Sequence, residues 1–326
     1  MTEPSVVHRV DAVDRGPIVI LAGATATGKT ALAVELAEIF GGEIVGADSV
    51  QIYRRLDIGS AKPRRDELRG MAHHLVDVAD LGEAYDAARY QRDADGVIAS
   101  IRERGRVPIV AGGTGLYLRA LVRGLAEGLA SDPDVRARLK ARASSPEALA
   151  AMHAEVARLD PTYAAKIHPT DPIRIVRALE VMETTGEPIS AHHARHAAQA
   201  DRYRALFLAL EADRDVLRER IAARARSMFD AGWVDEVRSI LADGYSPDLK
   251  PLRSVGYAEV VDFVRGGERD REGAIEAVRK ATVAFAKRQR TWFRGEKGVT
   301  WVAPELLRTD EWRGRIRTWL DPARRD

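Results

Sequence analysis

Residues 23–30 read GATATGKT and fit the phosphate-binding loop pattern G-x-x-x-x-G-K-[ST] at every fixed position. The apolar residues 17–22 before it are typical of a buried parallel strand, and residues 31–37 after it are typical of a helix. In this setting backbone N–H groups and the positive end of the helix converge on an anion. The pattern predicts a phosphate or diphosphate site, not a nucleotide in particular, built from Gly23, Ala24, Thr25, Ala26, Thr27, Gly28, Lys29 and Thr30. The alternative is a tight strand-to-helix turn without a ligand.

Composition narrows the class of protein around this loop. The 326 residues are 45% hydrophobic and 31% charged, which is enough for one large or two ordinary domains. The net charge of +2 argues against a uniformly basic nucleic-acid coat and leaves room for a local basic patch. The absence of cysteine excludes disulfides and thiolate chemistry. No apolar run reaches membrane-spanning length, and residues 1–15 lack signal-peptide features. We expect a disordered lead-in over 1–15 and a monomeric, cytoplasmic protein without membrane contact.

The order of apolar runs predicts the architecture. Expected strands at 17–22, 43–47, 73–78 and 107–111 each end in a polar or glycine-rich loop, with a crossover helix over 84–104. Residues 131–200 carry no convincing strand and are divided by prolines into short helices. A strand-like run at 203–210 returns to the sheet, and helices follow at 213–231, 234–243, 257–265 and 271–294. We predict a P-loop NTPase-like, doubly wound α/β core over 16–130 and 201–326, with a helical insertion over 131–200.

Two polar positions follow expected strands. Asp48 comes after the strand at 43–47, and Thr114 lies in the glycine-rich stretch 112–115 after the strand at 107–111. Because ligands bind at the carboxyl ends of parallel strands, Asp48 is a candidate for holding Mg²⁺ through water or for general-base catalysis. A turn or N-cap residue is the alternative for Asp48, and a plain connecting loop is the alternative for 112–115.

Histidine and basic residues form further clusters. His73 and His74 would point to opposite faces of a strand, and His192 and His196 lack the acidic partner of a zinc-binding motif, so zinc is not favoured. The helix over 271–294 has no acid between residues 278 and 294, whereas solvated helix faces usually mix charges. Phosphate contact is therefore expected from Arg279, Lys280, Lys287, Arg288, Arg290 and Arg294, opposite an apolar face of Val278, Ala281, Phe285 and Trp292. Two smaller basic clusters are Arg174 with Arg177, and Arg214, Arg218, Arg220 and Arg224.

Ordered motifs from about residue 16 to 301 resemble the bacterial tRNA dimethylallyltransferase, or IPP transferase, family. They are GATATGKT (23–30), DSVQIYRRLDIGSAKP (48–63), HHLVD (73–77), GGTGLY (112–117), DPIRIVRALEV (171–181), GW-x-DEV (232–237), SVGYAE (254–259) and AKRQRTWFR (286–294). The resemblance implies transfer of a dimethylallyl group from dimethylallyl diphosphate to the exocyclic amine of the adenosine 3′-adjacent to the anticodon. It further implies Mg²⁺ as cofactor, bound at Thr30, and the tRNA anticodon stem-loop as partner.

The resemblance also assigns expected roles to residues. Asp48 matches the family's proposed general base, Thr114 matches a second catalytic position, and Arg224 is expected to join the diphosphate site. Contact with tRNA is expected from Asp48, Ser49, Val50, Gln51, Thr114, Arg136, Ile173, Arg174, Ile175, Val176, Arg177, Val255, Gly256, Tyr257, Lys287, Arg288, Gln289 and Arg294.

Three other functions remain compatible with parts of the sequence. A P-loop kinase of nucleotides or small molecules would use the loop but would not need a basic last helix. A prenyltransferase of free adenine nucleotides would not need the insertion. A nucleotide-switched RNA-binding regulator would not need Asp48 beside the loop.

Overall fold

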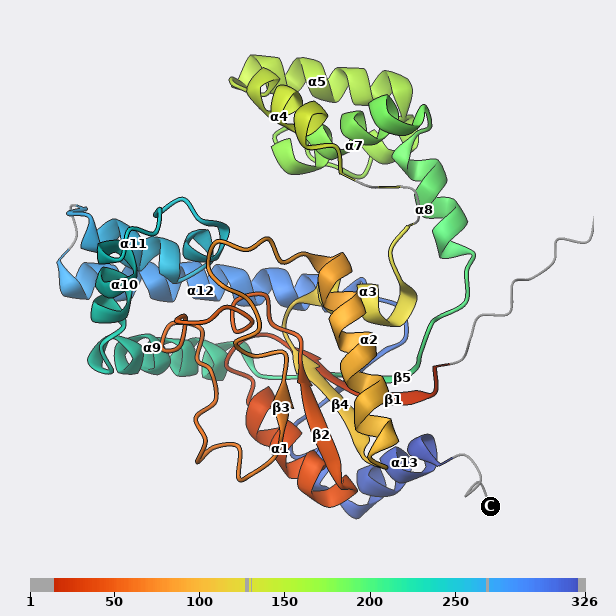
Figure 1. The fold of residues 1–326 in the computed structure, drawn as a ribbon, viewed down its shortest axis with the longest axis vertical. Helices are drawn as coiled ribbons and strands as arrows, with labels where there is room; N and C mark the ends of the chain where they lie inside the picture. Colours follow the sequence, from red (N-terminus) through yellow and green to blue (C-terminus); the bar gives the residue numbers. More distant parts are fainter. Residues whose placement is uncertain (1–14, 127–128, 130, 268–269, 322–326) are drawn as a thin grey trace, which may run out of the picture. The chain divides into compact units, whose positions relative to one another are not determined.

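The computed structural model describes residues 15–126, 129, 131–267 and 270–321. The chain packs as two compact units, one formed mainly by Arg123–Asp201 and the other by the segments before and after it (Figure 1). The expected insertion, 131–200, falls within the first of these, and the expected lead-in, 1–15, lies outside the described residues except for Arg15.

The larger unit is built on a six-stranded sheet in the order β3-β2-β4-β1-β5-β6. All strands run parallel: β1 Pro17–Gly23, β2 Gly42–Gly46, β3 His73–His74, β4 Val107–Gly112, β5 Arg204–Leu210 and β6 Val299–Val302. β1, which leads into the phosphate-binding loop, lies between β4 and β5, and its residues Ile18 to Ala22 are almost fully buried. The parallel sheet confirms the predicted α/β fold. A strand that is covered on both faces is apolar along its whole length, which is the pattern of residues 17–22.

Helices cover both faces of this sheet. The α-helices of this unit are α1 Lys29–Phe40, α2 Ala87–Glu103, α3 Gly115–Arg123, α9 Arg214–Asp230, α10 Trp233–Ala242, α11 Tyr257–Val264, α12 Arg271–Arg294 and α13 Asp310–Leu320, of which α10 and α11 pack on α9 and α12. Val19 and Leu21 of β1 share one core with α1 and α13. On the opposite face Phe207 of β5 meets Phe293 of α12, with ring centroids 6.2 Å apart. Alternate residues of the strands therefore contribute to two cores, because successive side chains of a strand point to opposite faces of the sheet.

The structure differs from the sequence prediction at two places in this unit. The strand expected over 73–78 ends after His74, because Leu75 and Asp77 adopt left-handed backbone angles (φ 60° and 58°) that no strand accommodates. At the carboxyl end of the chain, β6 and α13 were not among the predicted elements. Both complete the core around α1, to which α13 contributes Trp312 and Ile316.

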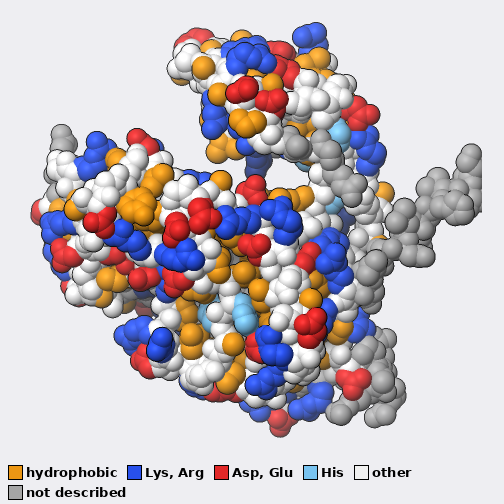
Figure 2. Space-filling view, in the orientation of Figure 1, with side chains coloured by type: hydrophobic (Ala, Val, Ile, Leu, Met, Phe, Trp, Pro, Cys, Tyr) orange, Lys and Arg blue, Asp and Glu red, His pale blue; other side chains and the backbone are white. Residues whose placement is uncertain are grey.

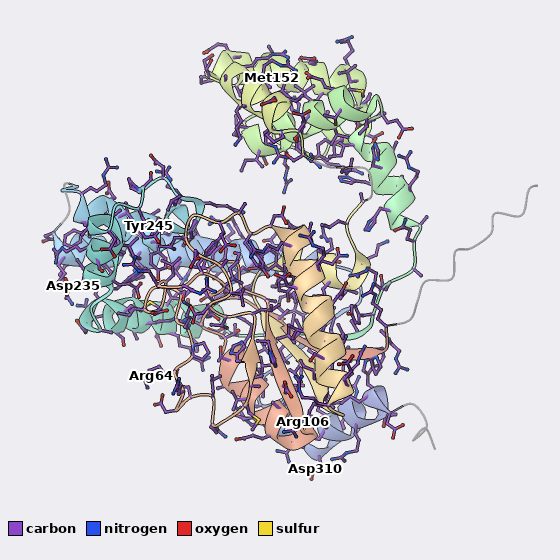
Figure 3. All side chains as sticks on the ribbon, in the orientation of Figure 1. Arg64, Arg106, Met152, Asp235, Tyr245 and Asp310 are labelled. Carbon is purple, nitrogen blue, oxygen red and sulfur yellow. The ribbon has the colours of Figure 1, made fainter. Side chains whose placement is uncertain are left out.

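The smaller unit is entirely helical in its described residues, with α4 Pro133–Arg142, α5 Pro146–Leu159, α6 Pro161–Ala164, α7 Pro172–Thr185 and α8 Ile189–Ala197. Four of these helices start with proline behind an oxygen-bearing cap, which is Asp132, Ser145, Asp160 or Asp171. Its core includes Leu139 of α4, Met152 of α5, which Figure 3 labels, and Leu179 of α7. The prolines that divide this stretch therefore mark helix starts.

Across the described ranges, no helix is long and apolar enough to cross a bilayer.

Candidate active site

The phosphate-binding loop connects β1 to α1 in a conformation ready for an anion. The hydroxyl of Thr27 donates to the carbonyl of Ala24 at 2.8 Å, which closes the loop. Gly28, with φ 87°, is the N-cap of α1 and offers no side-chain cap, and the first turn of α1, which the structure describes completely, contains no acid. The first N–H groups of the helix and its positive dipole end are therefore left for a ligand.

Lys29 begins α1 and brings the loop's positive charge into a buried position. Its Nζ donates to the carbonyl of Ala24 at 2.7 Å. Burial lowers the pKa of Lys29 to about 8, Arg224 pushes it in the same direction, and Asp48 partly offsets the shift. Burial also lowers the pKa of Arg224, which stands on α9, and here Asp48 and Glu67 act in the opposite direction. Lys29 and Arg224 place two positive charges beside the single carboxylate of Asp48. Binding of an anion would therefore stabilise this site electrostatically.

Asp48 follows β2 and caps the turn that comes after it. Its Oδ1 accepts from the backbone N–H groups of Val50 at 2.8 Å and Gln51 at 3.3 Å. These bonds fix the carboxylate at the sheet edge and leave Oδ2 without a hydrogen bond inside the described chain. The two interpretations of Asp48 are thus compatible, because Oδ1 can hold the turn while Oδ2 is left for a functional role.

The loop after β4 locks onto this turn. Thr114 Oγ1 accepts from Ser49 N at 3.0 Å, and Thr114 N donates to the Ala47 carbonyl at 3.1 Å. A Cβ at Gly112 would stand only 2.1 Å from the Ala47 oxygen, so only glycine allows the two strand ends to come this close. The turn that contains Asp48 and the loop that contains Thr114 are therefore in contact.

One cavity of about 760 Å³ runs along these groups. Its walls come from the phosphate-binding loop, the turn at Asp48, the connection between β2 and β3, the start of the loop after β4, and helices α9 and α12. Arg64, labelled in Figure 3, lies on that connection with 75% of its side chain exposed, whereas Lys29 and Arg224 are enclosed. The cavity volume suits a small organic ligand with a charged group.

The sequence reasoning missed the residue that anchors one wall of the cavity. Glu236 of α10 accepts from the backbone N–H groups of Asp57 at 3.0 Å and Ile58 at 2.7 Å, and from the hydroxyl of Tyr257 at 2.7 Å. From the other side, Gln51 Nε2 donates to the carbonyls of Ser60 and Ala61 at 3.0 and 3.1 Å. Only the motif GW-x-DEV, which contains Glu236, could have drawn attention to it, and a motif assigns no contact.

The expected tRNA-contacting residues of the larger unit divide into exposed and buried groups. Lys287, Arg288 and Arg294 are exposed on α12. Tyr257 is fully buried, and Gly256, with φ 92°, is the N-cap of α11. Gln289 points inward, where its amide joins Thr25 to Gly113. The buried face of α12 is formed by Ala274, Ile275, Val278, Ala286, Gln289 and Phe293, so of the four apolar residues expected there only Val278 belongs to it.

Charges elsewhere on α12 are already engaged. Arg279 forms a bidentate pair with Glu276 at 2.6 Å, and Lys280 lies 3.6 Å from the same carboxylate. Figure 2 shows basic and acidic side chains interspersed over the visible face, in keeping with the small net charge. Within the described part of the chain, the basic residues of α12 without an acidic partner are therefore those near its end, around Lys287 and Arg288.

In the smaller unit, two expected contact residues share one buried partner. Glu180 is fully buried on α7, and its Oε2 accepts from Arg136 Nη2 at 2.7 Å and Arg177 Nη1 at 2.8 Å. Both arginines keep partial exposure, 37% and 25% of the side chain. Of the remaining expected residues, Ile173 and Arg174 are exposed, while Ile175 and Val176 belong to the core.

The histidine pair separates as strand geometry predicts. His74 Nε2 bonds Glu43 at 2.7 Å, whereas His73 lines the cavity, and its buried Nδ1 has no partner among the described residues. Burial lowers the pKa of His73 to about 4, with His74 acting in the same direction, so the ring is neutral near pH 7. No cluster of three metal-ligating side chains occurs in the described ranges.

Comparison with known proteins places this site in a family. The family model described as IPP transferase matches residues 51–296. A tRNA dimethylallyltransferase of Myxococcus xanthus is 48% identical over 287 residues, which are 88% of this chain and 92% of the relative. The crystal structure of the full-length tRNA isopentenylpyrophosphate transferase from Bacillus halodurans is 34% identical, has a TM-score of 0.68, and is aligned over 94% of this chain and 97% of that chain.

A eukaryotic dimethylallyltransferase acting on tRNA has a TM-score of 0.79 at 24% identity, over 94% of this chain and 80% of that chain, and so shares the fold. The residues matched by the family model include the connection between β2 and β3, the start of the loop after β4, α9 and α12, which line the cavity together with the earlier phosphate-binding loop. The chain belongs to the IPP transferase family.

Proposed function

We propose that this chain transfers a dimethylallyl group from dimethylallyl diphosphate to the exocyclic amine of the adenosine 3′-adjacent to the anticodon of tRNA. The observation that carries the proposal is the shared cavity, in which a phosphate-binding loop and a strand-end carboxylate face the same space. A diphosphate at Lys29 and an amine at Asp48 could then react across it. The family relatives named above act on tRNA, which supports the choice of acceptor.

The donor would be held by its diphosphate. The open N-terminus of α1, Lys29 and Arg224 supply N–H donors and positive charge. As the reaction proceeds, the bond between the allylic carbon and the diphosphate oxygen breaks, and negative charge builds up on the departing diphosphate. The two cations stand where that charge develops, which favours the transition state over the bound donor.

The acceptor needs help because the lone pair of an adenosine amine is delocalised into the ring. Asp48 would accept the amine proton through Oδ2 as the new carbon–nitrogen bond forms, which leaves a neutral secondary amine and free diphosphate. General-base help of this kind contributes about 10²–10⁴-fold in rate. Thr114, bonded to Ser49 in the same turn, would place the base of the target nucleotide against Asp48.

The oxygen donors around the loop fit a divalent cation. Thr30 offers a hydroxyl at one wall of the cavity, and a hard oxygen ligand of this kind suits Mg²⁺. Bound there with the donor, Mg²⁺ would supply charge neutralisation for the diphosphate.

The test uses labelled dimethylallyl diphosphate with a synthetic anticodon stem-loop. We expect label in an RNA that carries adenosine 3′ of the anticodon and none in the same RNA carrying purine riboside there, because that base lacks the amine. Equal labelling of free adenine nucleotides would favour a nucleotide prenyltransferase. Tight binding and hydrolysis of ATP without labelled RNA would favour the kinase.

A further inference from the structure

Gln289 lies on the inward face of a helix whose neighbouring side chains are exposed. Ala286, Gln289 and Phe293 are 2%, 7% and 1% exposed, while Lys287 and Arg288 face outward. An amide among apolar neighbours needs partners, because an unpaired buried polar group is costly. Its position does not suit the RNA contact that was expected for it.

The amide finds one partner on each of two loops. Its Oε1 accepts from Thr25 N in the phosphate-binding loop at 2.9 Å, and its Nε2 donates to the Gly113 carbonyl at 2.9 Å. The orientation of the amide is fixed by these partners, since one is a donor and the other an acceptor. A Cβ at Gly113 would stand 2.3 Å from Nε2, so this approach requires glycine.

Each loop serves a different reactant in the proposed function. The loop containing Thr25 would hold the donor diphosphate. The loop containing Gly113 continues to Thr114, which bonds Ser49 N at 3.0 Å in the turn capped by Asp48. One side chain thus joins the donor side of the cavity to the acceptor side, from a position 264 residues away from Thr25 in the chain.

We propose that Gln289 is a positioning residue that fixes the gap between the donor loop and the acceptor loop. This inference rests on the proposed function and adds to it the element that sets the reacting distance. Gln289 lines the cavity, but both ends of its amide are engaged by the two loops. Its loss should leave both binding sites intact and let the two loops shift relative to each other, and a shift of about 1 Å can lower a rate roughly 10²-fold.

The first experiment is the substitution Gln289→Met, which keeps length and removes both hydrogen bonds. We expect a fall of about 10- to 100-fold in the single-turnover rate at saturating donor and RNA. Donor and RNA dissociation constants should stay within about threefold of wild type.

The matched control is Gln91→Met. Gln91 on α2 can also bridge two partners: with its amide turned so that nitrogen faces an acceptor, it donates to Ala120 O and accepts from Arg202 Nη1, each at 3.2 Å. It does not line the cavity. Losing this amide should lower the melting temperature without a selective fall in the saturated rate. The comparison separates positioning from general loss of stability.

The second experiment is Gln289→Glu, measured as a ratio to wild type between pH 6 and pH 8. The introduced carboxylate can accept from Thr25 N but faces the Gly113 oxygen with a second acceptor. When protonated, it can donate to that oxygen and restore both bonds. Burial raises the pKa of a carboxyl, so we expect the rate ratio to rise as pH falls. Lys29, Asp48 and Arg224 also line this cavity. Because they are present in both proteins, dividing the variant's rate by the wild-type rate removes their contribution to the pH dependence.

Three outcomes would overturn the inference while wild type still modifies RNA. They are unchanged rates in both variants, a loss of RNA affinity that fully accounts for the defect, and a loss confined to donor affinity. The second would make Gln289 an RNA contact, and the third would limit it to shaping the phosphate-binding loop. If Gln289→Met does not fold, the pH ratio of Gln289→Glu decides. Failure of wild type to label RNA would instead refute the proposed function.

Discussion

Asp48 holds the turn through Oδ1 alone, and this makes the base role proposed for Oδ2 testable. Oδ1 is held by Val50 N and Gln51 N, so the turn depends on an acceptor that asparagine also provides. Asp48→Asn should therefore keep the turn and remove the base, with a fall of about 10²–10⁴-fold in the single-turnover rate. Rapid-quench measurements with saturating donor and RNA give this rate. If instead weaker Mg²⁺–diphosphate binding accounts for the entire loss, Asp48 is a metal ligand and not the base.

Lys29 gives donor binding a pH dependence. Because its pKa in the empty site is about 8, the ammonium is present below that pH and is lost above it. A bound diphosphate favours the charged form, so binding above pH 8 must take up a proton, and affinity should fall as pH rises from 8 to 9.5. Calorimetry in two buffers of different ionisation enthalpy measures the uptake.

Lys29→Ala should abolish that proton uptake. It should also weaken donor binding at pH 7 by about 1.5–3 kcal/mol, the usual contribution of a hydrogen bond to a charged group. Proton uptake that persists in Lys29→Ala would assign the titration to another group.

At the scale of the element, α10 supports one wall of the cavity through a single carboxylate. Glu236→Leu leaves Asp57 N, Ile58 N and the Tyr257 hydroxyl without their acceptor. We expect a loss of about 1–3 kcal/mol in the free energy of unfolding, measured with urea, because the hydroxyl of the buried Tyr257, left without an acceptor, carries a desolvation penalty. The control is the neighbouring Asp235→Ala, since Asp235 is 79% exposed and its ion pair with Arg238 lies at the surface. Equal stability of the two variants would show that this wall does not depend on Glu236.

The exposed end of α12 is expected to contact RNA phosphates. Replacing Lys287 and Arg288 with alanine should weaken anticodon stem-loop binding and make the slope of log affinity against log salt shallower by about one for each phosphate that is no longer neutralised. Donor affinity should not change. Arg279→Ala is the control on the same helix, because Glu276 already pairs with that guanidinium. A salt slope identical to wild type would mean that the charged end of α12 is simply solvated.

Local sequence patterns predicted the strands and helices well wherever one physical effect dominated. The buried parallel strands around the phosphate-binding loop and the long helices were recognisable from apolar runs and periodicity. The strand at 73–78 was overestimated, because the left-handed angles of Leu75 and Asp77 are not encoded by apolar pattern. β6 has only four residues and is held in the sheet by pairing with β5. In this pairing Val299 lies opposite Phe207, 92 residues earlier in the chain, so no local pattern predicts it.

The residue types of the candidate site were predictable from the sequence, but the directions in which the side chains point were less so. The phosphate-binding loop was identified from its motif, and Asp48 and Thr114 from their places after expected strands, whose ends meet at one edge of the sheet. Gln289 was grouped with its basic neighbours, since a helix of mixed residues does not reveal which face is buried until its packing partners are known. Glu236 carried no signal of its own, because a carboxylate that binds backbone N–H groups resembles any surface acid in sequence.

For the whole molecule, acid stability should depend on the edge of the sheet. Glu43 of β2 binds Arg104 at the end of α2 and His74 of β3, and these contacts lower its pKa from 4.5 to about 2. A depressed carboxyl pKa stabilises the fold fully above the unfolded value, and this contribution is lost as pH falls from about 4.5 toward 2.

Glu43→Gln should therefore lower the urea midpoint at pH 7, and its difference from wild type should shrink between pH 4.5 and pH 2.5. The control is Asp248→Asn, because Asp248 is 80% exposed. A difference between Glu43→Gln and wild type that stays constant with pH would exclude this carboxylate as the source.

The position of β1 between β4 and β5 also dictates when the catalytic cavity can exist. Its second neighbour follows the smaller unit in the chain, and Gln289, which fixes the phosphate-binding loop, is made 264 residues after Thr25. At roughly 5–20 residues per second, a ribosome needs about 10–50 s to cover that interval. We expect the nascent chain to carry an unbridged phosphate-binding loop for this whole period, so catalytic competence arrives only after α12 has been made. A transcript broken before the codons of α12 would yield an inert polypeptide.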